Sequence, residues 1–273
     1  MRTDLASEAR SFQSEQNGIT ETVRKAGGFA CTRITVETQA AARQLDKPVG
    51  QYLSIEYKPQ TLSDRAGVRA AARFAASELV RLLPEEGTAL VVGLGNRYIT
   101  ADALGTKTAE RVLVTRHLLQ TFSDVLPKQT RPVAAVCTGV LGVTGIETVE
   151  IVSALARELR PAVVLIVDSL AAAEPKHLGT VLQMNDTGIA PGAGVGNFRA
   201  VLSRRTLGVP VIALGIPLVI PAQSLAEGDW EEGMYVTPKD VDLMVKQSSD
   251  LLAETIDRAL HPKTHRILRN LLQ

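Results

Sequence analysis

The chain has 273 residues, of which 45% are hydrophobic and 4% aromatic, and its formal net charge is +1. This length and apolar content allow a substantial core, and the near-neutral charge gives no reason to expect a nucleic acid or an anionic membrane as a partner. Two cysteines, Cys31 and Cys137, are too few for a disulfide framework and favour a reducing compartment. Because the chain shows neither a signal-like beginning nor an apolar run near the ~20 residues of a membrane span, we expect a soluble, cytoplasmic protein.

Short aliphatic runs alternate with helical patterns along the chain. Such runs are typical of strands buried on both faces of a parallel sheet, and their alternation with helices favours βαβ units. The sequence predicts an α/β fold in one domain, residues 1–273, with a mainly parallel central sheet flanked by helices. An N-terminal segment, 1–50, and a polar loop, 222–237, are expected to decorate it. Strands are expected near 51–57, 88–93, 132–137, 162–168, 179–184 and 210–216, and helices near 63–83, 101–111, 145–159, 198–206 and 238–260.

Two of the predicted strands lead into aspartates. Gly93 and Gly95 break the first apolar run into a tight turn, and a helix capped by Thr100 would carry Asp102 in its first turn. A second apolar run ends in Asp168. Because open α/β sheets bind ligands at the carboxyl ends of their strands, we expect these two carboxyl groups to form an acid/base pair. Asp168 is expected to be the more buried, since it ends the more continuous apolar run.

Two glycine-rich stretches are candidates for contacts with a substrate. The first lacks the third glycine of the dinucleotide fingerprint, because Tyr98 stands there, so no nucleotide cofactor is expected. Its backbone amides could instead stabilise a developing oxyanion. The second follows Asp186-Thr187-Gly188, where Asp186 is expected to form an Asx-turn. The candidates for substrate or oxyanion contact are Gly93, Gly95, Asn96, Asp186, Gly192, Gly194 and Asn197.

The remaining reactive side chains suggest no second site. His177, His261 and His265 lack ligand spacing with cysteines or acids, so we predict no structural zinc. His117 is expected to be a packing residue, and Cys137 has no identifiable base that would make it a nucleophile. Neither a metal nor a cofactor is expected.

Many ordered stretches resemble the germination proteases of spore-forming bacteria, the endopeptidases that degrade small acid-soluble spore proteins. The resemblance extends nearly from end to end and is much more specific than any single glycine pattern. The matching stretches are Arg2–Ala6, Gly93–Asn96, Thr100–Gly105, Val114–Leu118, Gly142–Thr148, Val167–Ala172, Asp186–Ile189, Gly194–Asn197, Leu207–Ala213 and Met234–Asp242.

This resemblance implies an atypical aspartic peptidase on an α/β fold similar to hydrogenase maturation proteases, with Asp102 and Asp168 as its catalytic acids. It also implies a homotetramer of the spore core, made as a zymogen that loses a propeptide near Arg2–Leu5. We expect the apolar segment around 216–226 at an interface, and activity in the chain as written. The predicted function is hydrolysis of small acid-soluble spore proteins during germination, by an aspartate pair that activates water. No nucleic acid or membrane is expected as a partner.

Four positions depart from the family pattern. Ala101 and Thr106 replace prolines, Ala173 replaces an arginine and Ala190 replaces a histidine. The missing arginine and histidine are residue types that tune acids or hold a propeptide. Two alternatives therefore stay open beside the endopeptidase. One is a metal-assisted maturation peptidase with the two acids as ligands, and the other is a catalytically silent relative that only binds protein partners.

Overall fold

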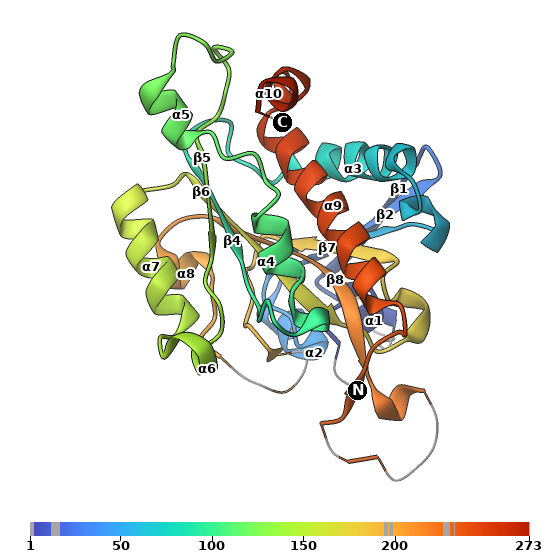
Figure 1. The fold of residues 1–273 in the computed structure, drawn as a ribbon. Helices are drawn as coiled ribbons and strands as arrows, with labels where there is room; N and C mark the ends of the chain where they lie inside the picture. The colour runs from blue at the N-terminus through green and yellow to red at the C-terminus, as the bar shows by residue number, and fades with distance from the viewer. Residues whose placement is uncertain are drawn as a thin grey trace.

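The computed structural model describes residues 3–11, 17–193, 196, 199–225, 230–231 and 233–272. All nine strands in these ranges belong to one sheet, in the order β1-β2-β3-β7-β8-β6-β4-β5, with β9 paired to β8 (Figure 1). The strands are β1 (Ile19–Ala26), β2 (Phe29–Val36), β3 (Gly50–Glu56), β4 (Ala89–Gly93), β5 (Val133–Cys137), β6 (Val163–Ala171), β7 (Val181–Asn185), β8 (Val211–Pro221) and β9 (Tyr235–Val236).

Helices cover both faces of this sheet (Figure 1). Helices α3, α4 and α9 pack on one face. The other face is covered by α7 and α8 over β4 and β6, and by α1 and α2 over β2 and β3. The helices are α1 (Ala6–Ser11), α2 (Gln39–Leu45), α3 (Arg65–Leu79), α4 (Leu104–Ala109), α5 (Arg116–Thr121), α6 (Leu141–Thr144), α7 (Thr148–Leu159), α8 (Arg204–Leu207), α9 (Val241–Leu260) and α10 (His265–Leu272).

The α/β class is confirmed, but the sheet is mixed rather than mainly parallel. Strands β5, β4, β6 and β8 run parallel, whereas β1, β2, β3 and β7 add to β8 through antiparallel pairs. The N-terminal segment expected to decorate the domain supplies β1 and β2, so it is part of the sheet itself. A tight Gly27-Gly28 turn, with both glycines at positive φ, joins these two strands and reverses the chain at once.

The parallel half of the sheet is the most completely buried part of the described chain. Every residue of 89–92 in β4 and of 163–167 in β6 is at most 1% exposed. Full burial of a Val, Leu or Ile side chain contributes about 1.5–3 kcal/mol each, and these strands bury such side chains on both faces. Strands β4 and β6 therefore form a rigid base for whatever their carboxyl ends carry.

The six strands predicted from the sequence are all present, and the long helices predicted over 63–83, 145–159 and 238–260 correspond to α3, α7 and α9. The helix expected over 198–206 is reduced to the short α8. In the segment expected at an interface, 216–226, Ile216, Leu218 and Ile220 of β8 are fully buried in the sheet, whereas Leu225 is 53% exposed. No helix in the described ranges has both the length and the apolar character needed to cross a membrane.

Candidate active site

Asp102 lies on the connection between β4 and α4, where it is fixed by two features of the preceding turn. Gly95 adopts φ +92°, and a Cβ on Gly95 would lie 1.9 Å from the backbone oxygen of Asp102, so only glycine fits there. The backbone N–H of Asn96 donates to Oδ2 of Asp102 at 2.7 Å. Together these contacts hold the Asp102 carboxyl close to the end of β4.

The local structure around Asp102 differs from the predicted capped α-helix. Thr100–Asp102 form a single 3₁₀ turn, its N-cap is Ile99 without a side-chain bond, and α4 begins only at Leu104. Thr100 therefore does not cap a helix, and Asp102 precedes α4 rather than lying in its first turn. The start of α4 packs tightly against the strands, since a Cβ on Gly105 would lie 2.2 Å from the Val167 oxygen.

Asp168 lies within β6 and is only 6% exposed, whereas Asp102 is half-buried. The prediction that Asp168 is the more buried acid is thus confirmed. Strand β6 does not end at Asp168 as expected, because pairing with β8 continues to Ala171 through an irregularity after Leu170. The N–H of Ser169 donates to Oδ1 of Asp168 at 2.9 Å.

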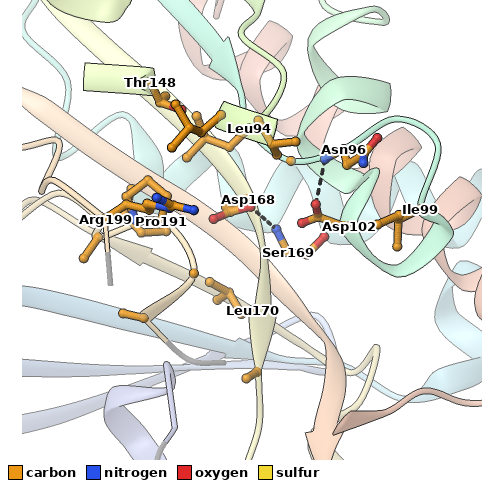
Figure 2. A pocket seen from close by; sticks show the side chains of 18 of the residues that line it. Leu94, Asn96, Ile99, Asp102, Thr148, Asp168, Ser169, Leu170, Pro191 and Arg199 are labelled. Atoms are coloured by element: carbon orange, nitrogen blue, oxygen red, sulfur yellow. Dashed lines mark hydrogen bonds between the residues drawn. The ribbon is translucent and has the colours of Figure 1, made fainter. Parts of the chain in front are cut away.

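The parallel pairing of β4 with β6 brings the two acids to the same place. Gly93 pairs with Val167, and the N–H of Leu94 donates to the Val167 oxygen at 2.9 Å, so the β4 turn leaves the sheet beside Asp168. Asp102 and Asp168 both line one cavity of about 480 Å³. Figure 2 shows the two carboxyl groups at this cavity, each held by a backbone amide.

The surroundings of the two acids raise their pKa values to different degrees. Burial raises the pKa of Asp102, and the Asn96 N–H opposes this shift. The pKa of Asp168 is raised well above its usual range by burial, then by the neighbouring charge of Asp102 and more weakly by that of Asp4, against the Ser169 N–H. Asp168 therefore holds its proton more strongly than Asp102, and the pair can present one acid and one base at the same pH.

Four other polar residues of the cavity were not predicted from the sequence as site residues. Ser169 follows Asp168, and its buried Oγ has no hydrogen-bond partner among the described residues. Arg199 pairs with Glu147 at 3.5 Å, and both residues line the cavity. Asp4 also lines it, from the opposite end of the chain. Asp4, Glu147 and Ser169 lie in stretches that match the family, but nothing in those stretches indicated a role for them, and Arg199 lies in none of them.

The glycine-rich candidates divide between the cavity and its support. Gly95, Asn96 and Gly192 line the cavity, although the Asn96 N–H is occupied by Asp102 and so is not a free oxyanion donor. Gly93 is the last residue of β4, and a Cβ there would lie 2.3 Å from the Gly105 oxygen. The absence of a side chain at Gly93 therefore allows α4 to pack closely on β4. Gly194 and Asn197 lie outside the described residues.

For Asp186, the structure differs from the expected Asx-turn and the expected contact with a substrate. It is not among the residues that line the cavity in the described part of the chain, and its Oδ1 accepts the N–H of Gln51 at 2.8 Å. It therefore ties the end of β7 to the start of β3. The expected Asx-type bond is made by its neighbour instead, since Oδ1 of Asn185 accepts the N–H of Thr187 at 3.1 Å.

The family departures fall both in and beside the cavity. Ala101 and Ala190 line it, so the loss of a proline and a histidine leaves small side chains at its wall. Thr106 is buried in α4, where its hydroxyl donates to the Ala103 oxygen. Ala173 is buried beyond β6, and its N–H donates to Glu8. In the described part of the chain, the hydrogen bonds to the carboxyl groups of Asp102 and Asp168 come from Asn96 and Ser169 and not from these four positions.

Cys137 and His117 both lie away from the cavity lining. Burial raises the pKa of the Cys137 thiol, which disfavours the nucleophilic thiolate. His117 is exposed on α5, so the expectation that it packs in an apolar environment is wrong.

One trio of described residues, Glu8, Glu174 and His177, places possible metal-ligand atoms within 4.8 Å of one another. The Glu8 carboxylate already accepts hydrogen bonds from the N–H groups of Ala173 and Glu174, and from Thr3 and His177. These donors satisfy the Glu8 carboxylate, so the trio is better explained as hydrogen bonding within the chain, which holds α1 to the segment after β6, than as a cation site.

Comparisons with known proteins identify the family that the chain resembles. A model of the germination protease family matches residues 1–230. A germination protease of Clostridium perfringens (strain SM101) is 34% identical over 96% of this chain and 95% of its own, and one of Bacillus cereus (strain ATCC 10987) is 40% identical over 82% and 64%. A solved [NiFe] hydrogenase maturation protease, HycI from Thermococcus kodakarensis KOD1, superposes with a TM-score of 0.42 at 18% identity, over 67% of this chain and 98% of its own.

Proposed function

Because the chain belongs to the germination protease family, we propose that it is an aspartic-type endopeptidase in which Asp102 and Asp168 activate water. The observation that carries the proposal is that two carboxyl groups with raised pKa values line one cavity, Asp102 from the turn after β4 and Asp168 from within β6. Perturbed acids in a cavity are candidates for catalysis. The substrates we propose are small acid-soluble spore proteins, degraded in the spore core during germination.

The unequal environments of the two acids support different roles. Amide hydrolysis needs a base that takes a proton from water and an acid that donates one to the carbonyl oxygen or the leaving nitrogen. Asp168 suits the acid, because burial and the charge of Asp102 favour its protonated form. Asp102 suits the base, because it is less buried and the Asn96 N–H stabilises its ionised form.

The proposed catalytic cycle moves protons between the two acids, the water and the substrate. Water attacks the scissile carbonyl while its proton passes to Asp102, and Asp168 donates its proton to the carbonyl oxygen, which leaves a tetrahedral gem-diol. The C–N bond then breaks as Asp102 returns its proton to the leaving nitrogen, and one hydroxyl of the gem-diol gives its proton back to Asp168, so that the carboxylic acid and the amine leave and both aspartates regain their starting states. Since like charges in one cavity do not both ionise easily, the pair titrates as a unit.

The cavity wall supplies groups for the substrate backbone. The unpartnered Oγ of Ser169 lies next to Asp168, and Gly192 brings backbone close to the cavity from the loop after β7. We propose that both contact the main chain around the scissile bond. Gly194 and Asn197 stay predicted contacts of the same loop.

The test is cleavage of a purified small acid-soluble spore protein by the wild-type chain and by Asp102→Asn and Asp168→Asn. We expect each variant to lose at least about 10²–10⁴-fold in kcat, the usual contribution of a general acid or base, with an unfolding midpoint close to that of wild type. Asp64→Asn is the matched control, because asparagine also caps the α3 N-terminus where Asp64 accepts the Gly67 N–H.

The alternatives give different results in the same assay. Cleavage that persists in EDTA and disappears in both variants supports the aspartate pair. Cleavage abolished by EDTA would favour a metal-assisted peptidase, and a folded wild-type chain that binds the substrate without cutting it would favour a silent relative. The family resemblance further supports a homotetramer, for which light scattering is the direct measurement.

A further inference from the structure

The N-terminal segment, residues 3–11, lies against the strand that carries Asp168. The N–H of Asp4 donates to the oxygen of Ala171 at 3.0 Å, and the N–H of Ala171 donates back to Oδ2 of Asp4 at 2.8 Å. Ala171 is the last residue of β6, three positions after Asp168. The side chain of Asp4 thus takes the place of a strand partner at the point where β6 leaves the sheet.

The segment is anchored on both sides of Asp4. Gln183 of β7 accepts the N–H of Ala6 at 2.7 Å and donates to the oxygen of Asp4 at 2.6 Å. Leu5 is fully buried against Leu170, Ala172 and Val181. These contacts fix the backbone of Asp4, so the position of its carboxyl group is set before any substrate arrives.

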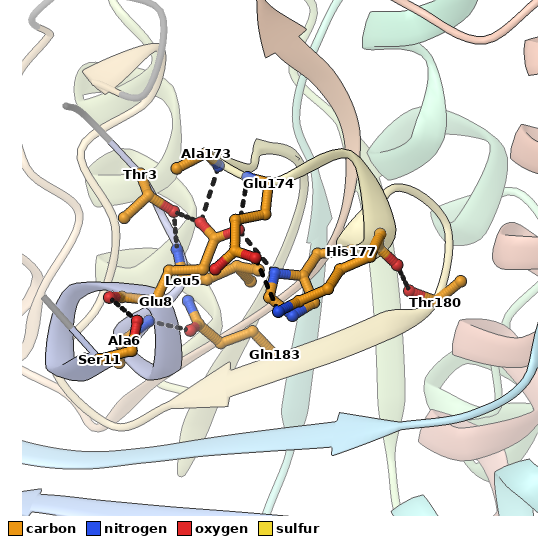
Figure 3. Close-up of polar contacts among 11 residues, drawn as sticks. Thr3, Leu5, Ala6, Glu8, Ser11, Ala173, Glu174, His177, Thr180 and Gln183 are labelled. Carbon is orange, nitrogen blue, oxygen red and sulfur yellow. Dashed lines mark hydrogen bonds and ion pairs between the residues drawn. The ribbon is translucent and has the colours of Figure 1, made fainter. Parts of the chain in front are cut away.

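Glu8 forms a second anchor one helical turn later (Figure 3). Its carboxylate is 1% exposed, accepts the N–H groups of Ala173 and Glu174 at 2.7 and 2.9 Å, and lies 2.6 Å from Nδ1 of His177. Burial alone would raise the pKa of Glu8, but the bonds from His177, Thr3 and the two amides outweigh it and lower the pKa. Glu8 therefore stays ionised and holds the chain that follows β6.

Asp4 brings a third carboxyl group to the cavity of Asp102 and Asp168. Burial raises the pKa of Asp4, and the charge of Glu8 adds to this shift, whereas the Ala171 N–H and the charge of Lys47, whose Nζ donates to the oxygen of Thr3 at 2.8 Å, favour the ionised form of Asp4. Asp102 and Asp4 both act on Asp168. In the described part of the chain no combination of these three acids places one oxygen from each within 4.8 Å, so they interact through charge rather than as a shared ligand set.

We propose that Asp4 is a positioning residue of the active site, which fixes β6 just beyond Asp168 and adds a negative charge to the cavity that favours the proton on Asp168. This role rests on the proposed function of the aspartate pair and extends it to a residue 164 positions away in the sequence. Asp4 acts on the reaction only through its effect on Asp168. Removal of its charge should therefore change the pH range of the reaction rather than abolish it.

The test is the pH profile of kcat for Asp4→Asn. Asparagine keeps an oxygen for the Ala171 N–H and removes the charge, so β6 keeps its partner while Asp168 loses its proton more easily. We expect the basic limb of the profile to move to lower pH, because the loss of one like charge at the edge of the cavity lets Asp168 lose its proton more easily. The acidic limb and KM should change much less.

Asp46→Asn is the matched control, because Asp46 is an exposed acid beside Lys47 that does not line the cavity, and its left-handed backbone is one that asparagine tolerates. This variant should keep the wild-type profile. Asp4→Ser is a second uncharged variant with the same expected shift.

An active Asp4→Asn enzyme with an unshifted basic limb would overturn the proposal, and so would the failure of both Asp4 variants to fold, which would make Asp4 a structural residue only. Neither result bears on the aspartate pair if Asp168→Asn is inactive in the same preparation. Conversely, cleavage that survives Asp168→Asn would remove the proposed function itself.

Discussion

Replacement of Gly95 by alanine tests how closely the site depends on the turn after β4. Gly95 has φ +92°, and its Cβ position lies 1.9 Å from the backbone oxygen of Asp102 and 2.9 Å from Oδ1 of the same residue. Ordinary contacts of a Cβ begin at 3.4 Å. An alanine side chain therefore requires the chain around Asp102 to move by about 1.5 Å, since no flexible side chain is present to yield.

The expected effect is much larger on activity than on stability. Alanine at positive φ costs about 1–2 kcal/mol, and displacement of Asp102 also weakens its bond from the Asn96 N–H. For catalysis, a misplacement of about 1 Å can cost about 10²-fold. We expect Gly95→Ala to stay folded, with a lower unfolding midpoint and a kcat reduced by about 100-fold or more.

Gly28→Ala separates the backbone strain from the displacement. Gly28 has φ +84°, but its Cβ position has nothing within 4 Å, and it lies in the β1–β2 hairpin. Both variants are compared by thermal unfolding and by cleavage of the same spore-protein substrate. If the two lose similar stability and retain similar kcat, the position of Asp102 is not what limits the reaction, and the role derived for Gly95 is wrong.

Two further predictions concern residues outside the cavity. Burial raises the pKa of Asp257, which accepts the Leu113 N–H, from 3.8 to about 7, so its contribution to wild-type stability is present at low pH and is lost as the pH rises through 7. Asp257→Asn should therefore gain up to about 4 kcal/mol relative to wild type between pH 4 and 8, and urea unfolding that shows a constant difference over this range would contradict the assignment. Cys137→Ser and His117→Ala should keep most of the wild-type turnover, because neither residue lines the cavity, and a loss comparable to that of Asp102→Asn in the same cleavage assay would reopen the choice of nucleophile.

The strands could be predicted because their residue pattern indicates their environment in the sheet. Both β4 and β6 are aliphatic on successive positions, which is the pattern of strands covered on two faces. The β1–β2 hairpin was missed although Gly27-Gly28 is a strong turn signal. Its first strand is exposed along nearly its whole length and has no alternation of apolar residues, so nothing in its sequence indicates a sheet edge.

The two acids could be predicted because each follows an apolar run, and the rule about strand ends then places them together. The local geometry around the two acids could not be predicted from the sequence. Asp168 lies inside β6 because β8 pairs beyond it, and this depends on a strand more than 40 residues later. Asp4 was missed for the same reason, since its partner Ala171 is 167 residues away and no local pattern joins them.

The asymmetry between the acids follows from where the chain places them, rather than from a dedicated partner for either. Asp168 is part of a strand buried on both faces, so its carboxyl group loses water on folding and gains one amide donor among the described residues. Asp102 also receives one amide donor, but it sits on a turn that stays half-exposed. With equal hydrogen bonding, the difference in desolvation decides which acid keeps the proton. A fold that delivers one acid from a strand and the other from the neighbouring turn therefore gives two identical side chains unequal affinities for a proton.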